Sequence, residues 1–355
     1  MDNSLELDSE TVASPSPRPS SESPPRSGAL SSSRSSAPSP PLPLYPSSVL
    51  LIFIDGVGIG KRGEQNPLDG LDSDFFSIFQ GEQPRLPFKG RLAATDTRLG
   101  IEGLPQSATG QTAILTGVNA AKLIGRHLHG YPSPRLKQAL AEHSIYKKLI
   151  AEGRSVTFAN AYTTNYLESR PRFVSCTTVA AKTAGLRFRL LEDLAAGRAV
   201  SHDFTNRFLI ERGFQVKECE PEQAGGNLAR LAAGHDFTLY EHFITDRIGH
   251  LRDRELSWKL TREHIPSLTR FIRAVLEAAD LDRQTVVITS DHGNIEDAST
   301  RGHTMNPVAT LAFGCASALI AARVRSLTDV TPSIVEALAG KGVETPGSAC
   351  TPSGS

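Results

Sequence analysis

Two apolar stretches that each end in an aspartate constrain this chain more than any other feature. Residues 49–54 read Val-Leu-Leu-Ile-Phe-Ile and precede Asp55, and residues 285–290 read Thr-Val-Val-Ile-Thr-Ser and precede Asp291. Continuous apolar runs of this length are typical of strands that are buried on both faces of a parallel sheet. Ligands of such sheets bind outside the carboxyl ends of the strands. We therefore expect both aspartates at the ligand-binding edge of one sheet.

Strand and helix patterns alternate along much of the chain. Further strands are expected at residues 156–161, 237–243 and 311–313, and helices at 109–116, 136–152, 258–279 and 328–338. Helices that separate buried strands cover both faces of the sheet they connect. The pattern therefore predicts an α/β fold with a mainly parallel sheet and helices on both faces.

Composition divides the chain into four kinds of segment. About half of residues 1–46 are Ser or Pro, which bury too little apolar surface to offset the entropy of ordering, so a disordered tail is expected there. Residues 47–162 and 236–340 are expected to form the enzyme-like core. Strand signals weaken within residues 163–235, and helices are expected there at 179–186, 190–196 and 222–233, which predicts a small inserted cap or lid. Residues 341–355, rich in Gly, Thr, Pro and Ser, are expected to form a flexible tail.

Charge and cysteine usage narrow the expected partners. Lys plus Arg equals Asp plus Glu at 38 each, which gives no indication of nucleic-acid or anionic-membrane binding. No stretch has the roughly 18 apolar residues of a membrane span, and the first residues lack the basic start and apolar core of a signal peptide. The four cysteines are scattered without a CxxC pair, which favours reduced thiols and a cytoplasmic location. The sequence leaves the oligomeric state open.

Aspartate and histidine side chains at strand ends indicate a metal site. Asp246 and His250 are four residues apart, so they share one face of a helical turn and can reach one ion. His292 follows Asp291, and Gly293 then permits a sharp turn, while His303 precedes an Asn-Pro loop. Carboxylate oxygen combined with imidazole nitrogen suits Mn, Zn, Co or Fe. We expect two divalent ions, Mn or Zn.

Ser107 is the candidate nucleophile. It comes just before the helix expected at 109–116, where backbone N–H groups and the positive end of the helix dipole favour a bound phosphate. Metal coordination would lower the pKa of its hydroxyl. Thr109 is a rival nucleophile, and each of these residues taken alone has a structural alternative, such as a helix cap or a turn. Their joint occurrence carries the hypothesis.

The order of these motifs resembles the metalloenzyme group of the alkaline phosphatase superfamily, in particular cofactor-independent phosphoglycerate mutase and phosphopentomutase. The resemblance extends from about residue 49 to residue 339. Its motifs are Asp55-Gly-Val-Gly, Ser107-Ala-Thr-Gly-Gln, Asp246-Arg-Ile-Gly-His250, Asp291-His-Gly-Asn-Ile-Glu296, His303-Thr-Met-Asn-Pro-Val and Leu327-Thr-Asp-Val-Thr-Pro. It implies an alkaline-phosphatase-like fold in which one ion binds Asp246, His250 and His303, and the other binds Asp55, Ser107, Asp291 and His292.

The chain departs from the mutases in two ways. Gln111 stands where the mutases usually have a histidine, which puts local contacts in doubt but not metal binding. The mutases also carry a much larger cap with basic substrate-binding residues, which match no position here. Four residues are loose candidates for phosphate binding, with solvated surface charge as their alternative role: Arg126, His129, Arg172 and Arg301.

Three functions remain open at this point. Two-metal phosphoryl transfer through Ser107 on a small phosphorylated substrate is favoured, with hydrolysis preferred because a small lid lets water compete. A phosphomutase acting on phosphoglycerate or a phosphopentose is the alternative. A non-catalytic protein that binds metal or phosphate is the third hypothesis, and the complete ligand set argues against it.

Overall fold

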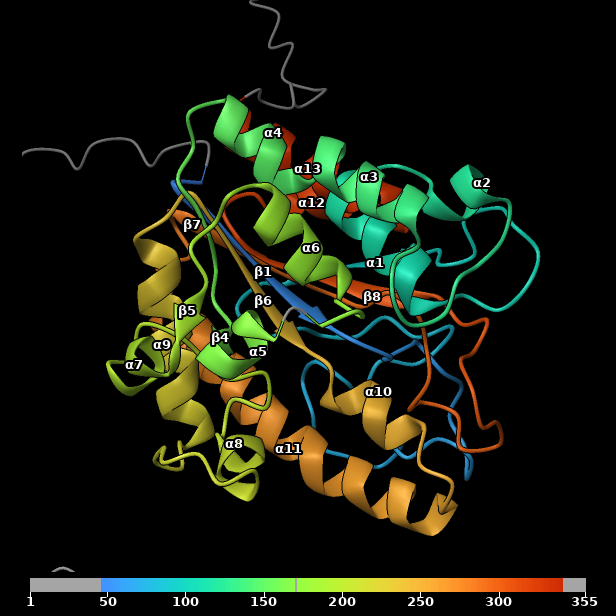
Figure 1. Ribbon diagram of the computed structural model, residues 1–355. Coiled ribbons are helices and arrows are strands. Elements are labelled where there is room, and N and C mark those ends of the chain that lie inside the picture. Colours follow the sequence, from blue (N-terminus) through green and yellow to red (C-terminus); the bar gives the residue numbers. More distant parts are fainter. Residues whose placement is uncertain (1–45, 170, 341–355) are drawn as a thin grey trace, which may run out of the picture. The chain divides into compact units, whose positions relative to one another are not determined.

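The computed structural model describes residues 46–169 and 171–340, which contain a six-stranded sheet with helices on both faces (Figure 1). The strands are β1 Ser48–Ile54, β2 Arg91–Thr95, β3 Val156–Phe158, β6 Phe237–His242, β7 Gln284–Thr289 and β8 Val308–Gly314, and a small second sheet pairs β4 Ala161–Tyr162 with β5 Arg189–Leu190. The tails expected at 1–46 and 341–355 lie outside the described residues, except for residue 46.

Helices connect these strands along the chain. They are α1 Ser107–Thr116, α2 Ala120–Ile124, α3 Pro134–His143, α4 Ile145–Ala151, α5 Thr164–Glu168, α6 Cys176–Thr183, α7 Leu191–Ala195, α8 Arg207–Glu211, α9 Pro221–Ala233, α10 Ile244–Gly249, α11 Arg254–Ala278, α12 Ser317–Arg323 and α13 Val330–Ala339, with a short 3₁₀ turn at Leu327–Asp329. No helix in the described part of the chain is both long enough and apolar enough to cross a membrane.

The mainly parallel sheet predicted from the sequence is confirmed. Its strand order is β2-β8-β7-β1-β6-β3, with β1 parallel to both β6 and β7, and β3 parallel to β6. The run at 311–313 does form a strand, but β8 is antiparallel to β7, and the unpredicted β2 pairs antiparallel with β8. The four parallel strands therefore direct their carboxyl ends toward the same edge.

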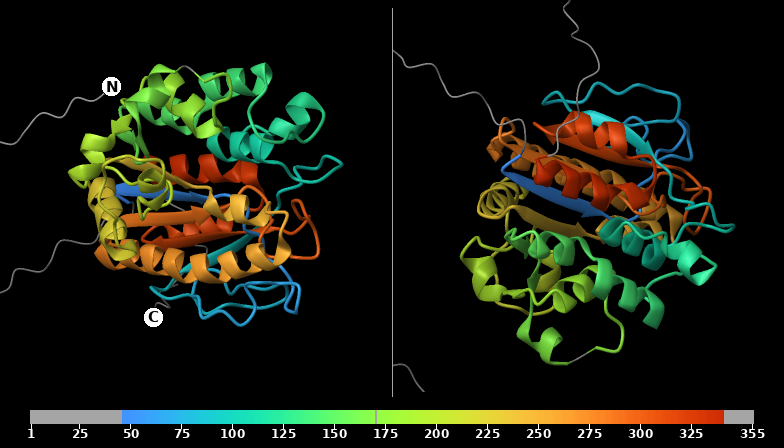
Figure 2. Two further views of the ribbon diagram at one scale, coloured as in Figure 1. Left: turned by 60° about the horizontal axis from the view of Figure 1, so that its bottom comes forward. Right: turned by 90° about the horizontal axis from the view of Figure 1, so that it is seen from above.

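Alternate side chains of β1 enter two different cores. Val49, Leu51 and Phe53 pack with α1, α3, α4, α6, α12 and α13 on one face. Leu50, Ile52 and Ile54 pack with α9 and α11 on the other face. Figure 2 shows these two helical layers on either side of the sheet. The unbroken apolar run is thus explained by burial on both faces, as a central strand requires.

Two helix predictions differ from the structure, one by an internal break and one in its first residue. The single helix expected at 136–152 is two helices, α3 and α4, because Ser144 between them has an extended backbone with ψ of 149°. Gly153 follows α4 with a φ of +76°, as expected of a glycine after a helix. The helix expected from 258 begins at Arg254, where the side chain of Asp253 caps it by accepting a bond from Leu256 N–H.

Elements of the region 163–235 pack on both helical layers. Helix α6 lies against α1 and α3, and helix α9 lies along α11 and also contacts β1. The helices expected at 179–186, 190–196 and 222–233 correspond to α6, α7 and α9. The assignment of residues 163–235 to an inserted cap stays a prediction.

Candidate metal centre

The sheet brings three aspartates from separate segments to one edge. Asp55 directly follows β1, Asp291 comes two residues after the end of β7, and Asp246 lies on α10 just beyond β6. The register aligns these strand ends, because Ile54 pairs with His242 of β6 and Phe53 pairs with Thr289 of β7. The backbone N–H of Asp55 also donates to His242 O at 2.8 Å.

One group of metal-ligand atoms forms around Asp55, Asp291 and His292. Their ligand atoms all lie within 4.8 Å of one another. His292 Nε2 is 3.3 Å from Asp55 Oδ1 and 3.5 Å from Asp291 Oδ2. Ser107 Oγ lies 3.0 Å from the same nitrogen. The four residues assigned to one ion from the family resemblance are thus adjacent in space.

A second group forms around Asp246, His292 and His303, whose ligand atoms also lie within 4.8 Å of one another. His250 borders this group, with Nε2 at 3.1 Å from His303 Nε2 and 3.4 Å from Asp246 Oδ2. The rings of His292 and His303 stack with centroids 3.5 Å apart. His292 therefore stands between the two groups, whereas the resemblance assigned it to the Asp55 group alone.

Burial makes the Asp55 group unfavourable without a cation. Asp291 and His292 are fully buried, and three carboxylate oxygens in the group have no hydrogen-bond partner: Asp55 Oδ1, Asp291 Oδ1 and Asp291 Oδ2. Burial, and then the charge of Asp246, raise the pKa of Asp291 to about 8. Burial, with the charges of Asp291 and Asp246, raises the pKa of Asp55. Unpartnered buried oxygens of this kind are what a divalent cation would satisfy.

The histidines of the site are suited to act as neutral ligands. Burial, followed by the proximity of His303, lowers the pKa of His292 to about 3. Burial likewise lowers the pKa of His303, and its Nδ1 lies 2.8 Å from Pro105 O, which leaves Nε2 directed at Asp246. A ring nitrogen bonded to a backbone carbonyl orients the other nitrogen for a metal. The donor set therefore fits divalent cations.

Three polar side chains that the sequence did not assign to the site support its aspartates and loops. Gln111 Nε2 donates to Asp55 Oδ2 at 3.1 Å, and Asn294 Nδ2 donates to Asp246 Oδ1 at 2.7 Å. Glu296 accepts bonds from the backbone N–H groups of Gly58 and Asn294. Asn294 and Glu296 belong to a motif that the sequence displayed, but their contacts depend on loop positions that no local pattern specifies.

The hydroxyl of the rival nucleophile Thr109 bonds to backbone groups and not to a metal-ligand side chain. Its side chain is fully buried, and Oγ1 donates to Gln106 O at 3.0 Å while accepting a 3.3 Å bond from Leu128 N–H. Ser107, in contrast, is the first residue of α1 and lies against His292. Between the two hydroxyls, the geometry favours Ser107.

A cavity of about 640 Å³ adjoins the second group of ligands. Its lining includes His250 and His303 and two of the four candidate phosphate-binding residues, Arg126 and His129. The ring of His129 is 5.9 Å from that of His303 and 6.1 Å from that of His250. Arg172 and Arg301 do not line this cavity, although Arg301 immediately precedes Gly302, which does. All four assignments remain predictions.

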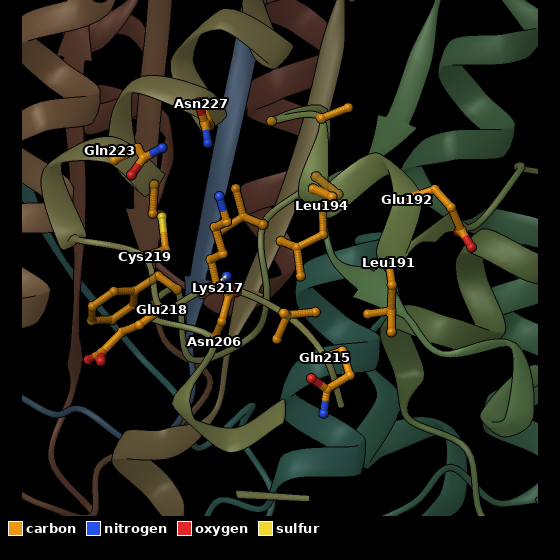
Figure 3. A pocket seen from close by; sticks show the side chains of 18 of the residues that line it. Leu191, Glu192, Leu194, Asn206, Gln215, Lys217, Glu218, Cys219, Gln223 and Asn227 are labelled. Atoms are coloured by element: carbon orange, nitrogen blue, oxygen red, sulfur yellow. Dashed lines mark hydrogen bonds between the residues drawn. The ribbon is translucent and has the colours of Figure 1, made fainter. Parts of the chain in front are cut away.

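A larger cavity of about 860 Å³ lies elsewhere, between α7, α9 and the segment that joins them. Leu191 and Leu194 line one side of it, and Gln223 and Asn227 line the other (Figure 3). None of its lining residues belongs to the metal-ligand groups. Its size alone therefore does not associate it with the candidate chemistry.

Comparison with known proteins gives a family match to part of the chain. Residues 222–341 match the family described as the Metalloenzyme superfamily. This range contains Asp246, His250, Asp291, His292 and His303, so the resemblance inferred from the motifs is confirmed there. Asp55 and Ser107 precede the matched range, and their link to the site rests on the geometry described above.

Individual relatives are distant. A 2,3-bisphosphoglycerate-independent phosphoglycerate mutase from Desulforudis audaxviator is 34% identical over 110 residues, which cover 29% of this chain and 21% of the mutase. The matched part thus spans about a fifth of that relative. The PH0037 protein from Pyrococcus horikoshii is 14% identical, with a TM-score of 0.50 over 84% of this chain and 99% of its own, and it supports the fold. A cold-active alkaline phosphatase from Shewanella sp. gives a TM-score of 0.47 at 12% identity, over 82% and 99% of the two chains.

Proposed function

We propose that this protein is a two-metal-dependent enzyme that transfers the phosphoryl group of a small phosphate ester through Ser107, with hydrolysis as the favoured outcome. The observation that carries the proposal is the position of Ser107 Oγ, 3.0 Å from His292 Nε2 and at the first residue of α1, beside two groups of buried metal-ligand atoms. A hydroxyl in this setting is more than a helix cap, because the N-cap of α1 is Gln106 and the Ser107 hydroxyl lies against His292 instead.

Two ions would divide the ligands between them. Asp55, Ser107, Asp291 and His292 would hold one, and the other would be held by Asp246, His250 and His303. The mixed oxygen and nitrogen donors favour Mn or Zn. When bound, the ions supply positive charge that lowers the pKa of the serine hydroxyl and stabilises charge on the transferring phosphate.

The reaction would proceed in two displacements. Ser107 Oγ forms a bond to phosphorus as the P–O bond of the ester breaks, and the departing alcohol takes up a proton. Water then attacks the phosphoserine, which releases inorganic phosphate and restores the hydroxyl. The N-terminus of α1, with ten residues, presents its positive dipole end to the phosphate throughout.

Mutase activity is the second candidate, and the relationship to a phosphoglycerate mutase favours it. A mutase must return the phosphate to its dephosphorylated intermediate before water reaches the phosphoserine, which requires a closed site. The candidate cap at 163–235 is short for this purpose, and the cavity beside His250 is lined by loops that leave Leu104 45% exposed. These features support hydrolysis over rephosphorylation.

The decisive experiment is turnover after metal reconstitution. Purified protein is loaded with Mn or Zn and tested on p-nitrophenyl phosphate, a phosphodiester analogue, and 2- and 3-phosphoglycerate, with free phosphate and isomer both measured. Phosphate release that is lost in Ser107→Ala would support a hydrolase. Isomer without free phosphate would support the mutase. Full activity in Ser107→Ala would refute the proposed nucleophile.

Metal stoichiometry separates an enzyme from a metal-binding protein that lacks activity. Ser107→Ala leaves Asp55, Asp291 and His292 to hold its ion, so this variant is expected to retain both ions while losing turnover. His303→Ala is expected to weaken the occupancy of one ion. Thr109→Val serves as the matched control for the serine, since the hydroxyl of Thr109 bonds Gln106 O instead of facing His292. Unchanged stoichiometry in His303→Ala would remove that histidine from the site.

A further inference from the structure

Two aromatic side chains, Tyr131 and Phe173, pack against each other although both are exposed to solvent. The rings of Tyr131 and Phe173 have centroids 5.3 Å apart, yet the residues are 52% and 58% exposed. They come from distant parts of the chain, so their pairing is a tertiary contact rather than a local one. Phe173 is the most exposed of the large hydrophobic residues in the described part of the chain. Contiguous exposed apolar surface, unlike a single exposed hydrophobic residue, is a feature of ligand-binding sites.

The pair lies close to the candidate metal centre. Tyr131 is two residues after His129, whose ring is 5.9 Å from the ring of His303. Two residues span at most about 7 Å. The backbone of Tyr131 therefore lies within about 7 Å of that of His129, which lines a cavity together with His250 and His303. Leu104, which lines the same cavity and is 45% exposed, extends the apolar surface.

Positive charge accompanies this apolar surface. The guanidinium carbon of Arg172 lies 5.5 Å from the ring centroid of Phe173, and Arg126 lines the adjoining cavity. Aromatic faces bind planar π systems by offset or edge stacking, and nearby cations attract an anionic substituent. The combination suits a planar ring joined to a phosphate.

We propose that Tyr131 and Phe173 form a subsite for a planar aromatic group on the alcohol side of the phosphate ester. The inference rests on the proposed phosphoryl transfer and specifies its substrate class as aryl or nucleobase-bearing phosphates rather than small aliphatic ones such as phosphoglycerate. The residues act in specificity: they hold the ring while the metal centre holds the phosphate.

The test compares ratios of kcat/KM. Metal-loaded wild type, Phe173→Ala and Tyr131→Ala are assayed on phenyl phosphate, thymidine monophosphate and glycerol 3-phosphate. Loss of one stacking partner is expected to lower the ratio of aromatic to aliphatic kcat/KM by about tenfold. Phe173→Tyr should preserve the ratio, and Ile150→Ala, at a residue 42% exposed on α4, is the control for losing an exposed apolar side chain.

Each outcome supports or overturns the subsite. A fall in the ratio for phenyl phosphate alone identifies a small aryl group, and a fall for thymidine monophosphate alone identifies a nucleobase. An unchanged ratio in both alanine variants, including an equal loss on every ester, shows a structural role and overturns the inference.

A binding measurement keeps the subsite testable if no ester is turned over and the proposed function fails. Calorimetry on the metal-loaded protein compares phenylphosphonate with methylphosphonate, neither of which needs to react. Tighter binding of phenylphosphonate that is lost in Phe173→Ala supports the subsite by itself. Equal binding of the two phosphonates overturns it whatever the enzyme assays give.

Discussion

Gln111 Nε2 donates a hydrogen bond to Asp55 Oδ2 at 3.1 Å, and both side chains are buried. The bond occupies one carboxylate oxygen and leaves Oδ1, which has no hydrogen-bond partner, directed at the candidate metal position. Gln111 thus supports the candidate metal ligand Asp55. It stands at the sequence position where the mutases that the motifs resemble usually have histidine. The amide holds the carboxylate without competing for the cation, because the donor is neutral.

Replacing Gln111 should therefore weaken metal binding. Gln111→Leu removes the donor at similar volume, and loss of a partner that orients a ligand typically costs about 10- to 100-fold in metal affinity. Gln111→His restores a donor and should recover part of the loss. Metal titration of the chelator-treated protein measures both. Wild-type affinity in Gln111→Leu would show that Asp55 needs no such support.

Glu296 joins three loops of the site. Its carboxylate accepts bonds from Gly58 N–H at 2.9 Å, Asn294 N–H at 2.8 Å, Thr304 Oγ1 at 2.5 Å and Asn306 Nδ2 at 3.0 Å. Glu296→Ala leaves several buried donors unpaired and should lower the free energy of unfolding by at least about 3 kcal/mol. Urea denaturation tests this, with Glu263→Ala, whose side chain is 58% exposed, as the control. Equal losses in the two variants would contradict the role.

The sequence predicted the parts of the site that depend on strand ends. An apolar run followed by Asp55 or Asp291 indicates both a buried strand and its carboxyl end, and parallel pairing then brings the two aspartates together. The contact of Gln111 with Asp55 is not predictable in the same way. The two residues are 56 positions apart, and no local sequence pattern specifies how α1 packs against the end of β1. The break at Ser144 was missed because apolar spacing continues across it.

Loading with metal should change how stability depends on pH. Burial raises the pKa of Asp291 to about 8 and that of Glu241 to about 7, while carboxyl groups in the unfolded chain ionise near pH 4. Between pH 6.5 and 8 the metal-free native state therefore holds protons that the unfolded state has released. Its stability should fall as pH rises, by about 1.4 kcal/mol per pH unit for each such proton.

Buried histidines do not reverse this trend within the chosen range. The pKa of His292 is lowered to about 3, so the native state keeps it neutral, and its stability is lost mainly as pH falls below about 6.5, where the unfolded chain takes up a proton that the native state does not. A bound cation takes the place of the proton at Asp291 and should flatten the slope. Denaturation at pH 6.5 and 8, with and without metal, measures the difference, and Asp291→Asn should flatten the metal-free slope in part. The same slope with and without metal would contradict the assignment of Asp291.

Gly110 allows α1 to approach Asp291 closely. A Cβ at Gly110 would lie 2.8 Å from Asp291 Cβ and 2.9 Å from Asp291 O, closer than such atoms can pack. Gly110→Ala should therefore displace α1, with Ser107 on it, and cost about 1–3 kcal/mol of stability.

Gly226→Ala on α9 is the matched control, since a Cβ there would meet nothing within 4 Å. That change should instead gain about 0.5–1 kcal/mol from helix propensity. Denaturation and metal titration of both variants would show the contrast. If Gly110→Ala proved as stable as Gly226→Ala and bound metal like wild type, close packing of α1 on Asp291 would not be what positions Ser107.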